Sequence, residues 1–252
     1  MQELLEEIEN YWDQRSSGYC ESNLEELETF KKEAWLKLIQ EQFPSVKDRK
    51  LRVLDIGTGP GFFAIIMAGA GHDVTAVDYT EAMLIKARTN ARRYHCDIHF
   101  EKMEAHKLLF ADNCFDLIVS RNLTWNLEEP EQAYQEWYRV LGKNGRLLNF
   151  DANWYLHVHN SEMRKEYEND RVMTRNKNLP DHYTNTDTRR MENIAKKLPL
   201  SKKLRPEWDV QELKKIGFKK IIIDKGIGER VRNTIEKLNY ASTPMFMIAA
   251  EK

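Results

Sequence analysis

The amino-acid sequence predicts an α/β fold in which a doubly wound, mostly parallel sheet carries helices on both faces. From residue 51 onward, short aliphatic or β-branched runs alternate with segments of helical periodicity, which is typical of parallel strands joined by crossover helices. The run at 115–120 is almost wholly apolar, as expected of a strand that is covered on both faces. The run at 52–56 leads into a glycine-rich turn directly before a helical pattern.

Seven strands are expected, at 52–56, 73–77, 98–102, 115–120, 146–150, 219–224 and 244–249. Thr80 is suited to cap the helix after the second strand, and Pro130 to the first turn of a later helix, where the N–H that proline lacks has no partner. Further helices are expected at 61–70 and 209–216, and two more ahead of the core, at 2–14 and 22–41, joined at 16–18. Segment 152–205 is polar and basic, and is predicted to be mostly helical.

Composition narrows the class of protein. The chain has 252 residues with 39 Lys plus Arg against 40 Asp plus Glu, a balance that argues against the nucleic-acid backbone as the main partner. No apolar run reaches the ~18–20 residues that cross a bilayer, and the acidic start lacks a signal core. Cys20, Cys96 and Cys114 are too scattered for a disulfide framework or a metal site. These features predict a soluble protein of the cytoplasm.

The stretch at 53–61, VLDIGTGPG, carries the chemistry. Glycines at a strand-to-helix turn let a ligand approach the backbone, and the helix that follows presents unpaired N–H groups. Asp78 ends the second strand, where a carboxylate can accept hydrogen bonds from both ribose hydroxyls of a nucleoside. Ligands of open α/β sheets bind at this carboxyl edge.

The glycine turn could bind either of two adenosine-containing ligands, NAD or S-adenosyl-L-methionine. Dinucleotide enzymes use GxGxxG, whereas here the third glycine comes one position earlier and Asp55 lies inside the turn. A carboxylate would repel a pyrophosphate but attract an ammonium and a sulfonium group. The pattern therefore favours S-adenosyl-L-methionine over NAD, although Asp55 could instead cap the following helix.

Four segments in this order resemble a known family: VLDIGTGPG at 53–61, VTAVDYTEAMLIKAR at 74–88, DNCFDLIVSRN at 112–122 and EPEQAYQEWYRVLGKNGRLLNFD at 129–151. The sequence resembles the class I S-adenosyl-L-methionine-dependent methyltransferases, and most closely the methyltransferase type 11 group related to ubiquinone/menaquinone C-methyltransferases. The resemblance implies a Rossmann-like sheet of seven strands with an antiparallel last strand. It divides the chain into a helical lid (1–45), a cofactor-binding core (46–151), a helical substrate-side insertion (152–205) and a segment that completes the sheet (206–252).

The resemblance also implies the cofactor-binding positions. The glycine turn would contact the methionine moiety, Asp55 its amino group and Asp78 the ribose. The usual Gly-Asp pair after the third strand is replaced here by Met103-Glu104, beside the adenine. The implied positions in the core are Asp55, Gly57, Thr58, Gly59, Gly61, Asp78, Tyr79, Met83, Met103, Glu104, Ala105, Arg121 and Asn122.

The N-terminal string YWDQRSSGY at 11–19 resembles the WDxRAxxYD opening of related enzymes. It suggests that Tyr11, Arg15 and Tyr19 close over the cofactor and exclude water. Ordinary helix packing of the aromatic residues is the alternative.

His157 follows the fifth strand, at the edge where a substrate should lie, and is the candidate general base because its pKa is near neutrality. With His159 it forms an HxH pair, but no further Cys or His cluster accompanies it, so no metal site is predicted. Asn153, Trp154 and Tyr155 are alternative substrate contacts at the same edge.

Segment 152–205 holds twelve basic and seven acidic residues, whereas residues 1–45 hold four basic and eleven acidic ones. The basic arginines Arg164, Arg171, Arg175, Arg189 and Arg190 could recognise an anionic substrate, form a solvated helix face, or meet the acidic N-terminal helices.

The resemblance implies transfer of the sulfonium methyl group to an O, N, S or C atom of a small molecule. Motifs of enzymes that methylate bases or amide nitrogens, Asn/Asp-Pro-Pro-aromatic and Pro-Cys, are absent from the sequence. Two alternatives remain: an enzyme that methylates RNA or protein through the basic insertion, and a protein that binds the cofactor without catalysis.

Overall fold

Seven strands form one sheet in the order β3-β2-β1-β4-β5-β7-β6. The computed structural model describes residues 2–44, 49–184 and 186–252. Strands β1 to β5 run parallel, and β7 pairs antiparallel with both β5 and β6. The predictions of a doubly wound sheet and of an antiparallel last strand are therefore confirmed. The strand bounds are Arg52–Ile56 (β1), Asp73–Asp78 (β2), His99–Lys102 (β3), Phe115–Arg121 (β4), Leu141–Asp151 (β5), Lys219–Asp224 (β6) and Phe246–Glu251 (β7).

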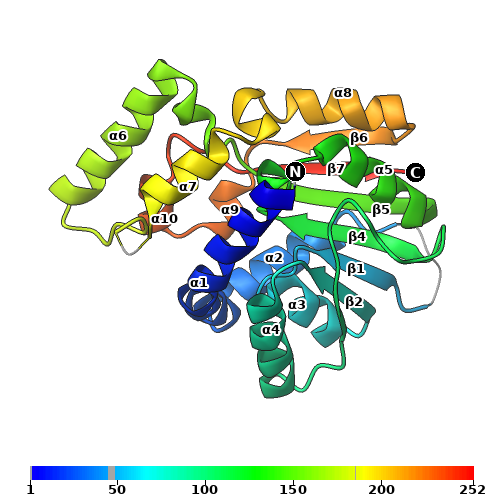
Figure 1. Ribbon diagram of the computed structural model, residues 1–252. Helices are drawn as coiled ribbons and strands as arrows, with labels where there is room; N and C mark the ends of the chain where they lie inside the picture. Colours follow the sequence, from blue (N-terminus) through cyan, green and yellow to red (C-terminus); the bar gives the residue numbers. More distant parts are fainter. Residues whose placement is uncertain (1, 45–48, 185) are drawn as a thin grey trace.

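Helices cover both faces because neighbouring side chains of each strand point to opposite sides. Val53 of β1 belongs to the apolar cluster under α2 (Phe30–Gln40) and α3 (Phe62–Gly69). Leu54 belongs to the cluster under α5 (Pro130–Val140) and α8 (Glu207–Ile216). Helix α4 (Glu81–Arg93) follows β2 and packs on α3 and β3. Figure 1 shows α5 and α8 on one side of the strands and α2, α3 and α4 on the other.

A second group of helices lies beyond the carboxyl ends of the parallel strands (Figure 1). Helix α1 (Gln2–Leu27) packs on both α4 and α7, and so joins the sheet domain to this group. None of the helices in the described ranges is both long and apolar enough to cross a bilayer. The other members of the group are α6 (Ser161–Asn176), α7 (Thr188–Ala195), α9 (Gly228–Val231), α10 (Thr234–Asn239) and the 3₁₀ turns η1 (Thr124–Asn126), η2 (Leu156–Val158) and η3 (Pro199–Lys202).

The predicted break between two N-terminal helices at 16–18 is wrong. One helix runs unbroken to Leu27, and α2 begins at Phe30. Ser16 and Cys20, one turn apart, are both buried, and Cys20 contacts Asn90 of α4. Ser16 therefore belongs to a packed helix face, whereas Ser17 and Gly18 are exposed on the same helix, and packing overrides weak helix propensity. The fifth strand also starts earlier than predicted, at Leu141.

The acidic N-terminal helix meets the basic insertion. Lys197 pairs with Glu7 at 2.5 Å, and Arg190 donates a hydrogen bond to Gln14 at 2.7 Å. Part of the basic surface is therefore used inside the chain, in line with the last of the three alternatives for this segment.

Candidate active site

The glycine turn after β1 lies at the point where the chain switches from one half of the sheet to the other, between β2 and β4. The N–H groups of Gly57 and Thr58 both donate to the carbonyl of Val77, at 2.9 and 3.0 Å, and tie the turn to β2. Gly57 has φ +68°, and a Cβ there would lie 2.8 Å from the Leu123 side chain. Only glycine fits this close approach without strain.

Asp55 lies beneath the turn and is 2% exposed. Its carboxylate accepts hydrogen bonds from the Thr58 hydroxyl at 2.6 Å and from the Ala64 N–H, in the first turn of α3, at 3.0 Å. Burial raises the pKa of Asp55 to about 7, against the lowering effect of these donors. Asp55 thus caps α3 and also lines a small cavity with Tyr19, Asn23 and Arg121.

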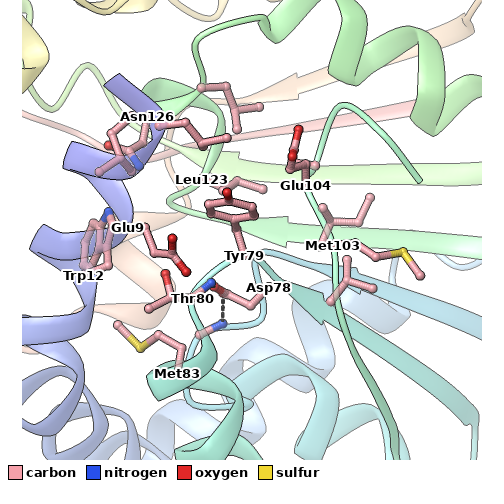
Figure 2. Close-up of a pocket in the computed structure, with 18 of the residues that line it drawn as sticks. Glu9, Trp12, Asp78, Tyr79, Thr80, Met83, Met103, Glu104, Leu123 and Asn126 are labelled. Carbon is pink, nitrogen blue, oxygen red and sulfur yellow. Dashed lines mark hydrogen bonds between the residues drawn. The ribbon is translucent and has the colours of Figure 1, made fainter. Parts of the chain in front are cut away.

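Asp78, at the carboxyl end of β2, is held by two backbone donors. It accepts from the Gly59 N–H at 2.8 Å and from the Thr80 N–H at 2.9 Å. Burial raises the pKa of Asp78, and the backbone donors oppose this shift. Figure 2 shows the carboxylate on the wall of a larger cavity, beside Tyr79 and Thr80.

This larger cavity, the edge cavity, has an empty volume of about 890 Å³ counted to its open mouth, which is the size of a typical cofactor site. It takes side chains from the turns after β1, β2, β3 and β4 and from α1. Its lining residues are Leu5, Ile8, Glu9, Trp12, Tyr19, Ile56, Gly57, Gly59, Val77, Asp78, Tyr79, Thr80, Met83, Met103, Glu104, Ala105, His106, Arg121, Asn122, Leu123, Asn126, Leu127 and Glu128.

Helix α1 forms one wall of the edge cavity. The Trp12 ring meets the Tyr19 ring edge-on, with centroids 5.6 Å apart, and Glu9 pairs with Lys102 at 2.7 Å. Tyr11 and Arg15 do not line either cavity among the described residues. Tyr11 is 6% exposed in an apolar cluster with α7, as the packing alternative states. Tyr19 lines both cavities.

Arg121, at the end of β4, connects the two cavities. Its guanidinium pairs with Glu26 of α1 at 2.7 Å and lies over the Phe62 ring at 4.4 Å. Burial lowers the pKa of Arg121 and the Glu26 carboxylate raises it, with a net upward shift. The guanidinium therefore keeps its charge beside both cavities, with one carboxylate already bound.

His157 does not line either cavity within the described part of the chain. Its Nε2 lies 3.1 Å from Glu192, and its ring stacks on Tyr167 with centroids 4.3 Å apart. Burial lowers the pKa of His157, and Glu192 opposes this shift. Proton transfer by His157 stays a prediction, one that would require the substrate to extend toward α6 and α7.

The alternative contacts at this edge also have partners. Asn153 exchanges hydrogen bonds with the backbone of Arg205, and Tyr155 packs on Trp125 with centroids 4.8 Å apart. The Trp154 indole N–H is buried without a hydrogen-bond partner in the described structure. Among the described residues, no group of three or more His, Cys, Asp or Glu side chains is placed to hold a metal ion.

The sequence did not single out several residues that line the edge cavity. Among them are Glu9, Trp12, Asn126 and Glu128. Trp12 belongs to the string at 11–19, but the resemblance of that string indicated Tyr11, Arg15 and Tyr19 as the cofactor contacts. The others belong to helix α1 and to the turn after β4, and only their packing around the cavity sets them apart.

The chain is similar in sequence to known methyltransferases over part of its length. Residues 54–149 match the family described as methyltransferase domain. The demethylmenaquinone methyltransferase of Renibacterium salmoninarum is 34% identical over 114 residues, which are 45% of this chain and 46% of that protein. This chain spans about half the length of the curated relatives that it matches.

Solved structures share the fold. A Methanococcus maripaludis protein described as an S-adenosyl-L-methionine-dependent methyltransferase has a TM-score of 0.60 at 20% identity, covering 95% of this chain and 93% of that one. The phosphoethanolamine N-methyltransferase 2 of Haemonchus contortus, in complex with phosphomonomethylethanolamine and S-adenosylhomocysteine, has a TM-score of 0.59 at 18% identity, covering 86% of this chain and 52% of that one. Residues 54–149 of this chain are therefore similar to the methyltransferase domain family, and the chain shares its Rossmann-like fold with solved methyltransferase structures.

Proposed function

We propose that the protein is an S-adenosyl-L-methionine-dependent methyltransferase that methylates a small molecule. The observation that carries the proposal is the position of Asp78. Its half-buried carboxylate ends β2, is fixed by the N–H groups of Gly59 and Thr80, and faces a cavity next to a glycine turn. A carboxylate held in this way suits the two hydroxyls of a ribose.

The remaining cofactor contacts follow from this anchor. Tyr79 and Met83 flank the adenosine, and the segment Met103 to Ala105 borders the adenine, since all of them line the edge cavity. The methionine moiety extends past Gly57 toward the smaller cavity, where Asp55 meets its ammonium group. The Arg121 guanidinium and Tyr19 lie on the same side, close to where the methionine carboxylate would end.

The chemistry requires little more than alignment. The sulfonium of the bound cofactor supplies an activated methyl group. Holding the two reactants in line can contribute about 7–11 kcal/mol toward lowering the barrier. Helix α1 covers the cavity with Trp12 and Tyr19, which limits the entry of water. A catalytic dyad is therefore unnecessary for this proposal.

A small-molecule acceptor is supported by the enclosure of the site. The edge cavity is roofed by α1, and α1 is in turn packed on α7 of the insertion. The names of demethylmenaquinone methyltransferase and phosphoethanolamine N-methyltransferase indicate small acceptors for those proteins.

The test is a transfer assay with cofactor that carries a radiolabelled methyl group. A cell extract is separated by ultrafiltration into a low-molecular-mass filtrate and a macromolecular retentate, and each fraction is incubated with the protein. At a cofactor concentration below saturation, we expect label in the filtrate compounds with the wild type and far less with Asp78→Asn. Label in retained RNA or protein would support an enzyme that methylates RNA or protein. Cofactor binding without transfer to either fraction would support a protein that binds the cofactor without catalysis.

A further inference from the structure

Two side-chain amides on the wall of the edge cavity lack partners. Asn122 and Asn126 flank the turn after β4, and within the described residues neither amide takes part in a hydrogen bond. Asn126 is only 7% exposed, yet it lines the cavity. A buried amide without partners costs about 1–3 kcal/mol, so we expect a ligand to supply them.

The turn that carries these amides is firmly held. The Asn122 N–H donates to the Phe150 carbonyl at 2.8 Å, and the Trp125 indole N–H donates to the Asn122 carbonyl at 2.9 Å. Asp151 accepts from the Trp125 N–H at 3.0 Å and from the Thr124 hydroxyl at 2.5 Å. Such support fixes the two amides before a ligand arrives.

Asp151 is itself fixed by a buried ion pair. Arg205 pairs with it at 2.6 Å and with Asp209, also at 2.6 Å, and all three side chains are almost completely buried. The position of the amides is therefore set by the core of the domain.

The amides lie apart from most of the proposed cofactor contacts. In Figure 2, Asn126 lies on the side of Tyr79 away from Met103 and Glu104. Neither Asn122 nor Asn126 lines the smaller cavity, where the methionine moiety is expected. The amides are thus placed to contact the second reactant.

Charge on the cavity wall opposes an anionic second reactant. Glu104 and Glu128 line the cavity, and Glu128 makes no hydrogen bond or ion pair within the described residues. Arg121 is already bound to Glu26, and His106 lies 2.9 Å from Glu104. An anion would therefore meet more negative than positive charge.

The arginines of segment 152–205 do not offset the negative charge on the wall of the edge cavity. Arg164 pairs with Glu192 at 2.7 Å and Arg171 with Asp181 at 2.6 Å, and Arg190 bonds to Gln14. None of these arginines lines the edge cavity among the described residues. Their placement favours a structural use of this charge over recognition of an acidic substrate.

We propose that Asn126, together with Asn122, which the resemblance placed among the cofactor positions, forms the acceptor subsite, and that the methyl acceptor is a small amine or alcohol without negative charge. This inference rests on the proposed methyltransferase function. The acceptor, an alcohol or an amine that has lost its ammonium proton to water, donates its N–H or O–H to an amide oxygen, and its lone pair faces the methyl carbon. The new bond forms as the carbon–sulfur bond breaks, the electron pair stays on sulfur, and the acceptor's proton passes to water.

Saturation-transfer NMR tests this inference with three matched probes, propylamine, propan-1-ol and propionate. Each probe is titrated into wild-type protein saturated with S-adenosylhomocysteine, into Asn126→Leu and into Asn193→Leu. Asn193 is an exposed residue of α7, so its variant controls for the same change of side chain away from the cavity. Calorimetry with S-adenosylhomocysteine and the midpoint of thermal unfolding are measured for each protein.

We expect the amine and the alcohol to bind wild type and Asn193→Leu, and propionate to bind neither. Asn126→Leu should bind the amine and the alcohol about fivefold more weakly, which corresponds to one lost hydrogen bond. It should keep its affinity for S-adenosylhomocysteine and unfold at the same temperature or higher, because a buried unpartnered amide is removed.

Preferential binding of propionate, or unchanged probe binding by Asn126→Leu, would overturn the inference. Loss of S-adenosylhomocysteine affinity in Asn126→Leu alone would also overturn it, because Asn126 would then be a cofactor contact. Failure of the wild type to bind S-adenosylhomocysteine would instead refute the proposed function, and this inference with it.

Discussion

Asp55 illustrates how one carboxylate serves both the fold and a ligand. It caps α3 through the Ala64 N–H and lines the smaller cavity. Since burial raises its pKa to about 7, the free protein carries Asp55 partly protonated near neutral pH. A cationic group bound beside it would favour the ionised form.

Affinity for S-adenosyl-L-methionine should therefore increase as the pH rises from about 6 to about 8. The ammonium group of the bound cofactor lowers the raised pKa of Asp55, so binding releases a proton. Proton release is favoured at higher pH, and affinity therefore increases with pH. Asp55→Asn should flatten this part of the pH dependence. Calorimetry in two buffers of different ionisation enthalpy measures the released protons, and equal release by both proteins would contradict the assignment.

Gly57 is the residue of the turn that tolerates a side chain least. Gly57→Ala places a Cβ 2.8 Å from Leu123 at φ +68°, so we expect it to lower the free energy of unfolding by about 1–3 kcal/mol. Gly69→Ala, at the end of α3 with no atom within 4 Å of its Cβ, should change it little or raise it. Urea unfolding compares the two variants, and similar values for both would show that the turn can relax.

Residues within the turn motifs could be predicted from the sequence, whereas those that pack onto the turns could not. Asp78, Tyr79 and Met83 follow a strand at fixed spacing, and all of them line the edge cavity. Glu9 and Asn126 reach it only because α1 and the turn after β4 fold over the same sheet edge. Nothing in the local pattern of either segment marks these side chains as facing a ligand.

Helix α1 shows that the bounds of a whole element can also depend on tertiary packing that the local sequence pattern does not reveal. Ser16 and Gly18 have low helix propensity and suggested a linker, but the helix continues to Leu27 because its buried face packs on α4, where Cys20 contacts Asn90. Strands β1 and β2 end within one residue of their predicted bounds, since a buried strand is set by its own apolar run, and β6 keeps its predicted bounds although it is largely exposed. Helices α9 and α10 were not predicted because they are too short to show a helical period, although Asn233 and Glu236 form a capping box at the start of α10.

Tyr19 is the α1 residue expected to matter most for the cofactor, since it lines both cavities and lies over Gly59. Tyr19→Ala should weaken S-adenosylhomocysteine binding about 3- to 10-fold through the loss of aromatic contact. Tyr19→Phe keeps the ring and should retain most of the affinity. Calorimetry on both variants tests this, and equal affinity of Tyr19→Ala and the wild type would remove Tyr19 from the site.

At the scale of the whole molecule, the site joins segments far apart in the sequence. Helix α1 is tied to the sheet domain by Glu9–Lys102 and Glu26–Arg121, and to the insertion by Glu7–Lys197. A ligand held between α1 and the sheet edge therefore stabilises contacts across the chain.

S-adenosylhomocysteine at about 100 times its dissociation constant should stabilise the folded state by about 2.7 kcal/mol. For a protein of this size, the midpoint of thermal unfolding should then rise by about 5–10 °C. Differential scanning fluorimetry measures the shift, with adenosine monophosphate as a control nucleotide. A rise of equal size with both compounds would mean that the site does not recognise the sulfur nucleoside.

The central claim is that Asp78 anchors the cofactor, and the most direct measurement is calorimetric titration of S-adenosylhomocysteine into three proteins. Asp73→Asn changes an exposed carboxylate at the opposite end of β2 and serves as the control for Asp78→Asn. We predict that the wild type and Asp73→Asn bind equally, and that Asp78→Asn binds about 10- to 150-fold more weakly, the equivalent of one charge-assisted hydrogen bond. Equal affinity in all three proteins, or no binding by the wild type, would contradict the account.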